Sequence, residues 1–162
     1  MPDARAALEM FLDAIEARDA QRMLDALADD VTLEAEVLRT PIRGKQTFAD
    51  LLAGAPDTWE EARIDRRMVV ASGRHAAALI HVHVRFAGDA ELLGETLPTA
   101  GKELSMMGAL FAEVDDAGKI SRLIRVWDLL GVMRQLDLSP EHLLALARKF
   151  EERMAQRRPR AA

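Results

Sequence analysis

The stretch that decides the fold spans residues 119–136, KISRLIRVWDLLGVMRQL. Up to Trp127 apolar and polar residues alternate as in a strand, and from Asp128 onward apolar residues recur at helical spacing. Successive strand side chains point to opposite faces, so the alternation predicts that Ile124, Val126 and Asp128 share a face. Asp128 then ends an apolar row, where a carboxylate either caps the following helix or serves as the acid of an apolar pocket.

Helical patterns precede this stretch and one follows it. Apolar residues recur at helical spacing in residues 4–17, 21–27 and 45–53, and Ser139 with Pro140 begins a last helix. The predicted strands alternate in apolar character; they are residues 31–37, 59–72, 74–87, 103–114 and 119–127. Helices, then an antiparallel sheet, then a terminal helix describe an α+β domain.

The composition is that of one globular domain. The chain has 162 residues, of which 49% are apolar and 30% charged. No apolar run approaches the roughly 20 residues that span a bilayer, and the N-terminus lacks the basic start of a signal peptide. We therefore expect a cytoplasmic protein that does not bind membranes. Cysteine is absent, which removes disulfides and thiolate metal sites, and the net charge of −5 argues against nucleic acid as the partner.

Three stretches resemble the SnoaL-like polyketide cyclase branch of the nuclear transport factor 2-like superfamily. They are residues 11–44, the shared helix pair and first strand; residues 91–102, ELLGETLPTAGK; and residues 126–136, VWDLLGVMRQL. The resemblance implies a cone-shaped, curved antiparallel sheet packed against N-terminal helices. It assigns residues 1–138 to this domain, and leaves residues 139–162 as an extra C-terminal helix and basic tail that packs on the domain or on a partner subunit.

The resemblance also implies a chemistry without metal or cofactor. In that branch the closing aspartate is a general acid/base in an apolar cavity, where it deprotonates a polyketide ester and assists an intramolecular aldol ring closure. Asp128 is the residue that matches this catalytic position. The implied function is a cyclase or isomerase acting on an apolar, polyketide-like or multi-ring small molecule. The candidate substrate-binding residues are Phe11, Trp59, Val82, Met106 and Leu110.

The usual partners of such an aspartate are missing from this sequence. Leu110 stands where many members carry a supporting histidine, and the acid/base positions of ketosteroid isomerases hold Ala35, Phe11 and Leu110. An epoxide hydrolase of this superfamily would need a second aspartate to activate water. Two functions therefore stay open: catalysis by Asp128 alone, and a non-catalytic small-molecule-binding or dimerisation module.

His81 and His83 lie two residues apart on one strand face, opposite the apolar row within residues 80–86. A zinc site needs further ligands, and no third ligand is suitably placed, so we predict no metal. If the apolar row faces the cavity, the histidines lie on the outer face, where we also expect Arg125 and Trp127. Trp and Arg are enriched at interfaces, so this face predicts a homodimer. Ligand binding by the histidines is the alternative.

Overall fold

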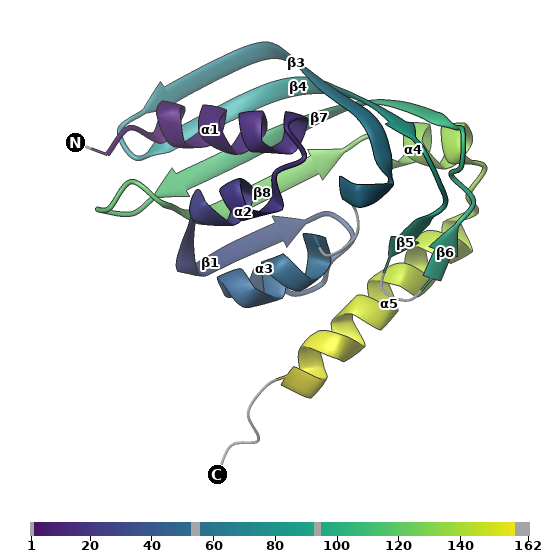
Figure 1. The fold of residues 1–162 in the computed structure, drawn as a ribbon. Helices are drawn as coiled ribbons and strands as arrows, with labels where there is room; N and C mark the ends of the chain where they lie inside the picture. The colour runs from purple at the N-terminus through teal and green to yellow at the C-terminus, as the bar shows by residue number, and fades with distance from the viewer. Residues whose placement is uncertain (1, 53–55, 93–94, 158–162) are drawn as a thin grey trace.

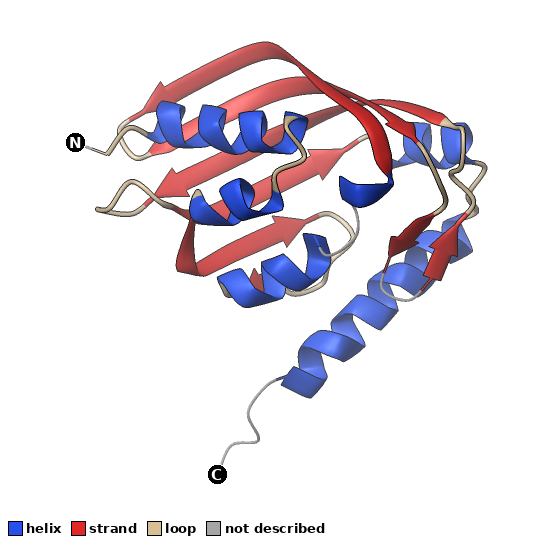
Figure 2. Ribbon diagram, viewed as in Figure 1, coloured by secondary structure: helices blue, strands red, loops and turns tan. Residues whose placement is uncertain are grey.

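The computed structural model describes residues 2–52, 56–92 and 95–157. In this part of the chain, a curved main sheet has helices packed against one face (Figures 1 and 2). Its strands follow the spatial order β2-β1-β8-β7-β4-β3. Their bounds are β1 (Leu27–Ala35), β2 (Ile42–Arg43), β3 (Trp59–Ser72), β4 (His75–Phe86), β7 (Glu103–Val114) and β8 (Ile120–Trp127). The predicted α+β class, with helices on a curved sheet, is confirmed.

The pairing of the first strand differs from the prediction. β1 runs parallel to β8, with Leu33 opposite Leu123, whereas the other described strand pairs are antiparallel. A purely antiparallel sheet is therefore wrong for this one pair. The two strands at the edges of the sheet, β2 and β3, do not pair with each other, so the sheet stays open.

The remaining elements surround this sheet. The helices are α1 (Ala4–Glu16), α2 (Ala20–Asp25), α3 (Lys45–Leu52), a short 3-10 turn (Pro56–Thr58), α4 (Leu129–Leu136) and α5 (Pro140–Arg157). None of the helices in the described ranges is both long and apolar enough to cross a bilayer. α5 reaches back to the domain through Glu151, which accepts the backbone N–H of Arg39 at 2.9 Å, and through an ion pair between Lys149 and Glu95.

The segment between β4 and β7, expected to be a turn-rich loop, contains a small hairpin of β5 (Ala90–Leu92) and β6 (Glu95–Leu97). Thr99 fixes its base, because the buried hydroxyl accepts the N–H of Ala90 at 2.8 Å and donates to the carbonyl of Gly88 at 3.0 Å. The periodicity of the sequence did not reveal this hairpin, whose strands have only three residues each.

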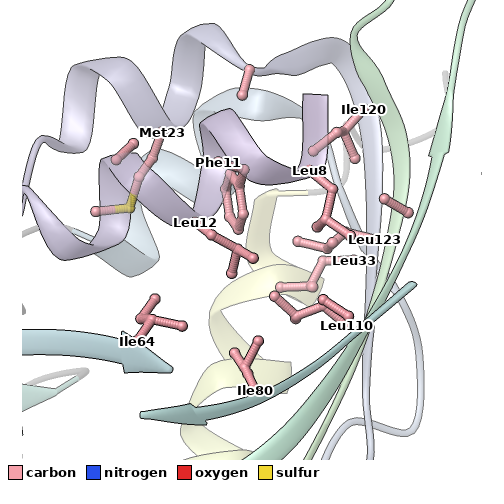
Figure 3. Packing of buried hydrophobic residues seen from close by; sticks show 14 of the residues in the cluster. Leu8, Phe11, Leu12, Met23, Leu33, Ile64, Ile80, Leu110, Ile120 and Leu123 are labelled. Atoms are coloured by element: carbon pink, nitrogen blue, oxygen red, sulfur yellow. The ribbon is translucent and has the colours of Figure 1, made fainter. Parts of the chain in front are cut away.

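The core lies between α1 and the inner face of the sheet (Figure 3). Asp3 begins α1 by accepting the backbone N–H of Ala6 at 2.9 Å, and the helical spacing that follows turns Leu8, Phe11 and Leu12 toward the strands. The strand row predicted to face inward is buried, and consists of Ile80, Val82, Val84 and Phe86. Burial of these apolar side chains is the main force that holds the helix on the sheet.

The inner face of β8 is the opposite of the predicted one. On β7, Glu113 and Val114 are consecutive, but their partners on β8 are Arg122 and Ile120. β8 therefore contains one extra residue at this point, a β-bulge. Because side chains alternate between the two faces of a sheet, the extra residue turns every later side chain of β8 to the face opposite the one expected. Leu123 is consequently buried at 1% exposure, whereas Val126 is 48% exposed on the outer face. The prediction that Ile124, Val126 and Asp128 form the inner row is therefore wrong.

Trp127 consequently lies on the inner side, where it packs against the core. Its partner in the β7–β8 ladder is Gly108, and a Cβ at that position would collide with the indole ring. The glycine leaves the space that the tryptophan occupies. The expected place of Trp127 on the outer face is therefore wrong.

We predict that Gly108→Ala lowers the free energy of unfolding by about 1–3 kcal/mol, since the new methyl group displaces the indole from its site. Urea denaturation monitored by tryptophan fluorescence, in a Trp59→Phe background that leaves Trp127 as the single tryptophan, measures both the stability and the changed surroundings of Trp127. Gly88→Ala is the matched control, because a Cβ at Gly88 meets nothing within 4 Å. Equal stability of the two variants would contradict the packing described for Trp127.

Candidate functional site

The predicted substrate-binding residues divide into two groups. Phe11, Val82 and Leu110 are only 3%, 5% and 2% exposed and form part of the packed core, where Figure 3 shows Phe11 and Leu110 among other apolar side chains. Trp59 and Met106 are partly buried and pack at its margin. The structure thus brings all of them to the inner face. Their contact with a ligand stays a prediction.

Asp128 lies at the junction of β8 and α4, as the change of periodicity predicts. Its carboxylate accepts the backbone N–H of Gly131 at 2.9 Å and its carbonyl accepts that of Val132 at 3.0 Å, so it is the N-cap of α4. The residue is exposed. A Cβ at Gly131 would collide with the carboxylate, so this pair is built for the cap. The catalytic role of Asp128 stays a prediction.

Arg125 is the charged side chain that the bulge turns inward. Its ladder partners are Leu110 on β7 and Ala35 on β1, and both are buried on the inner face. The Nε atom of Arg125 is buried and has no hydrogen-bond partner among the described residues. A buried guanidinium nitrogen without an acceptor lowers the stability of the fold, so its presence indicates a ligand or a functional role. The expected place of Arg125 on the outer face is wrong.

The electrostatic surroundings of Arg125 offer little compensation. Burial lowers the pKa of its guanidinium, and the carboxylate of Glu36 offsets this effect in part. Glu36 is itself exposed and accepts the backbone N–H of Trp127 at 3.1 Å. Arg125 lines a hollow of about 310 Å³ together with the end of β1, the loop after it and the outer row of β8; the other lining residues are Glu34, Ala35, Glu36, Leu38, Arg39, Pro41, Ile124 and Val126. An anion entering this hollow would find the free Nε donor of Arg125 and the guanidinium of Arg39, beside the carboxylates of Glu34 and Glu36.

The sequence contained no clear signal for this site. In residues 120–127, ISRLIRVW, each of the two alternating rows carries one arginine, so polarity alone does not distinguish inside from outside. Arg122, in the other row, pairs on the surface with Glu34 at 2.7 Å. The difference between the two arginines comes entirely from the bulge.

His81 and His83 lie on the outer face, as predicted. They are half-buried, stacked on each other with a centroid separation of 4.5 Å, and hydrogen-bonded to Ser105 of β7. In the described ranges no group of three or more His, Cys, Asp or Glu side chains is arranged to hold a metal ion.

We predict that Asp128→Ala destabilises the domain by about 1 kcal/mol, because α4 loses its cap, whereas Asp128→Asn changes stability by only a few tenths, since asparagine caps equally well. Urea denaturation of the two variants beside the wild type measures this difference. Equal losses in both variants would show that the negative charge, and not the capping hydrogen bond, stabilises this junction.

The comparisons with known proteins agree with this architecture. The model of the SnoaL-like domain family matches residues 8–123. A putative polyketide cyclase from Xanthomonas campestris pv. campestris has 25% sequence identity and a TM-score of 0.66, over 82% of this chain and 96% of that chain. An epoxide hydrolase of Mycobacterium tuberculosis described as LEH-like has 22% identity and a TM-score of 0.63, over 83% of this chain and 92% of that chain.

A third solved structure is similar to this chain at lower identity. It is AclR, a putative hydroxylase from Streptomyces galilaeus, with 16% identity and a TM-score of 0.70, over 85% of this chain and 97% of that chain. No curated protein matches this chain in sequence. Because the family model matches well over half of its residues, the chain belongs to the SnoaL-like domain family.

Proposed function

We propose that this SnoaL-like domain binds an apolar small molecule with an anionic oxygen, and that Arg125 binds that oxygen. The observation that carries the proposal is the buried Nε of Arg125, which has no acceptor among the described residues. Guanidinium groups bind carboxylates and other planar anions through parallel hydrogen bonds. Leu38, Pro41 and Val126 line the same hollow and suit an apolar ligand body.

Membership of the SnoaL-like family favours a cyclase or isomerase reaction on the bound small molecule. Removal of a proton beside a carbonyl produces an enolate, and a cation placed in a site of low polarity stabilises such an anion. The name "putative polyketide cyclase" carried by a similar structure points to polyketide-like substrates of this kind. The proposed acid/base is Asp128, acting without metal or cofactor on a ligand that reaches from Arg125 to the start of α4.

The alternative is binding without turnover. The exposure of Asp128 and its use as a helix cap favour this alternative, because its carboxylate already accepts the backbone N–H of Gly131. Native mass spectrometry of the purified protein identifies a co-purifying ligand. Conversion of that ligand by the wild type but not by Asp128→Asn would select the enzyme, and unchanged conversion by the variant would remove Asp128 from the mechanism.

We predict that Arg125→Met weakens the binding of anilinonaphthalene sulfonate, an apolar anion, by about tenfold or more, while leaving the neutral N-phenylnaphthylamine unaffected. Stability should stay equal or rise, since a buried guanidinium with an unpartnered nitrogen is replaced by an apolar chain of similar length. Fluorescence titration measures the affinities and thermal melting measures the stability.

The matched control for this prediction is Arg122→Met, which removes an arginine of the same strand that already pairs with Glu34 on the surface. This control should leave the preference for the anionic dye intact. Equal loss in both variants would mean that the dye responds to the net charge of the protein, and an unchanged preference in Arg125→Met would refute the proposed anion site.

We also propose that the outer face of the sheet binds a second copy of this chain. Large apolar side chains from neighbouring strands lie exposed there, and we call them the apolar outer patch: Met68, Val70, Leu79, Met107, Phe111 and Val126. A monomer rarely exposes so many large apolar side chains together. Both signs of charge border the patch, through Glu113 and Arg122, so a two-fold axis can bring opposite charges together. His81 and His83 lie beside it.

We predict that Phe111→Glu converts a wild-type dimer into a monomer, because Phe111, 46% exposed, lines a hollow of about 320 Å³ within the patch and its replacement buries a charge in the interface. Size-exclusion chromatography with light scattering measures the mass. Leu144→Glu, on the exposed side of α5, is the control and should stay dimeric. A monomeric wild type at tens of micromolar would contradict the interface.

A further inference from the structure

A continuous chain of hydrogen bonds crosses the outer face beside the apolar outer patch. Asp65 of β3 lies 3.2 Å from Nε2 of His83, and Nδ1 of the same histidine lies 3.2 Å from the hydroxyl of Ser105. The hydroxyl also lies 2.9 Å from Nε2 of His81. Arg63 holds the other oxygen of the Asp65 carboxylate at 2.7 Å. The three strands β3, β4 and β7 each contribute to this row.

The chemistry of the partners fixes the direction of these bonds. An ionised carboxylate only accepts, so Nε2 of His83 carries the hydrogen and donates to Asp65. In the neutral ring Nδ1 is then an acceptor, and it takes the hydrogen of the Ser105 hydroxyl. The serine oxygen can accept in turn from the N–H of His81. Ser105 is thereby placed against a histidine that a carboxylate orients, which is the arrangement of an activated serine nucleophile.

The strand does not need the Ser105 hydroxyl to hold its position. The backbone N–H of Ser105 donates to the side-chain oxygen of Gln135 at 2.7 Å, and the side-chain nitrogen of Gln135 donates to the carbonyl of Ser105 at 2.7 Å. These bonds, together with the ladder to β4, fix the main chain. The fold therefore does not depend on the hydroxyl of Ser105, and its removal should leave the fold intact.

The serine and its histidine open onto a hollow of about 430 Å³. Charged side chains of both signs line it, among them Arg63, Arg85, Glu61 and Glu103. Arg85 is paired with Glu61 at 2.8 Å, so its charge is partly balanced. Arg63 is paired with Asp65 and Arg85 also with Glu60, so an oxygen that becomes negative near Ser105 shares these guanidiniums with carboxylates.

We propose that Ser105 is the nucleophile of a second site, on the outer face, which accepts the acyl group of a small carboxylic ester. His83 is the general base that takes the hydroxyl proton, and Asp65 and His81 are positioning residues. This site is distinct from the inner-face site around Arg125 and does not depend on it.

The reaction balances without any cofactor. The serine oxygen forms a bond to the ester carbonyl carbon while its proton passes to Nδ1 of His83. The intermediate then expels the alcohol, whose carbon–oxygen bond breaks and whose oxygen takes the proton from His83. A water molecule deprotonated by the same nitrogen attacks the acyl-serine, releases the carboxylic acid and restores the hydroxyl of Ser105.

The test is covalent labelling of the full chain with diisopropyl fluorophosphate, followed by peptide mass mapping, and release of nitrophenolate from p-nitrophenyl acetate. We expect one adduct on the peptide that contains Ser105, and none in Ser105→Ala. His83→Gln should slow both reactions by about 100-fold, in the range found for lost general bases. Asp65→Asn should slow both reactions as well. If the rates of this variant fall below those of the wild type while its melting temperature is unchanged, Asp65 positions His83 and is not merely needed for folding.

Ser72 provides the internal control. It lies on the same face opposite His75, is exposed, and in the described part of the chain makes no hydrogen bond to that histidine. Ser72→Ala should react as the wild type does. An adduct on another residue, or equal rates in the wild type and Ser105→Ala, would overturn the proposal. The mapping uses the wild type alone, so it decides the matter even if a variant of His83 or Asp65 fails to fold.

Discussion

The register shift in β8 controls the interior of this domain, because it selects which side chains of the central strand meet α1. β8 lies between β1 and β7, so its inner row is in contact with both. With the extra residue in place, Leu123 completes the core and Arg125 follows it toward the end of the strand. Without the shift, Val126 would lie inside and the guanidinium of Arg125 would be solvated. The apolar core and the partly buried guanidinium of Arg125 thus share one structural cause.

Much of the architecture was predictable from the periodicity of the sequence. β3 and β7 have the expected bounds, since each ends at a turn, at Gly73 or before Gly118. The row from Ile80 to Phe86 faces inward as predicted, because all of its members are apolar and the opposite row is polar. The parallel pairing of β1 with β8 joins distant parts of the chain and was not predictable, and neither the hairpin held by Thr99 nor the bulge in β8 was evident from the periodicity.

The roles of the candidate site residues were likewise only partly predictable from the sequence. An aspartate at a strand-to-helix junction fits a cap and a pocket acid equally well in the sequence, and only the bond to Gly131 shows that it caps. Arg125 and Trp127 were expected on the outer face because alternation was extended past the bulge. His81 and His83 lie where the alternation places them, because the register of β4 with β7 is unbroken.

The inner and outer faces consequently differ in what they can bind. The inner face is aliphatic, with Leu110 at a central position and one arginine near its end. The outer face combines an exposed apolar area with a row of hydrogen-bonded polar side chains. The sheet therefore separates two chemical environments by the thickness of one layer of backbone.

The two hydrogen bonds between Gln135 and Ser105 have a consequence for solubility. β8 ends opposite Gly108, so the backbone of β7 before that residue has no neighbouring strand on this side. The amide of Gln135 accepts and donates as a peptide group of an adjacent strand would, and Asp128 adds its N–H to the carbonyl of Met107. α4 thus imitates a strand at an otherwise open edge, and closes it to the strand addition through which sheets aggregate.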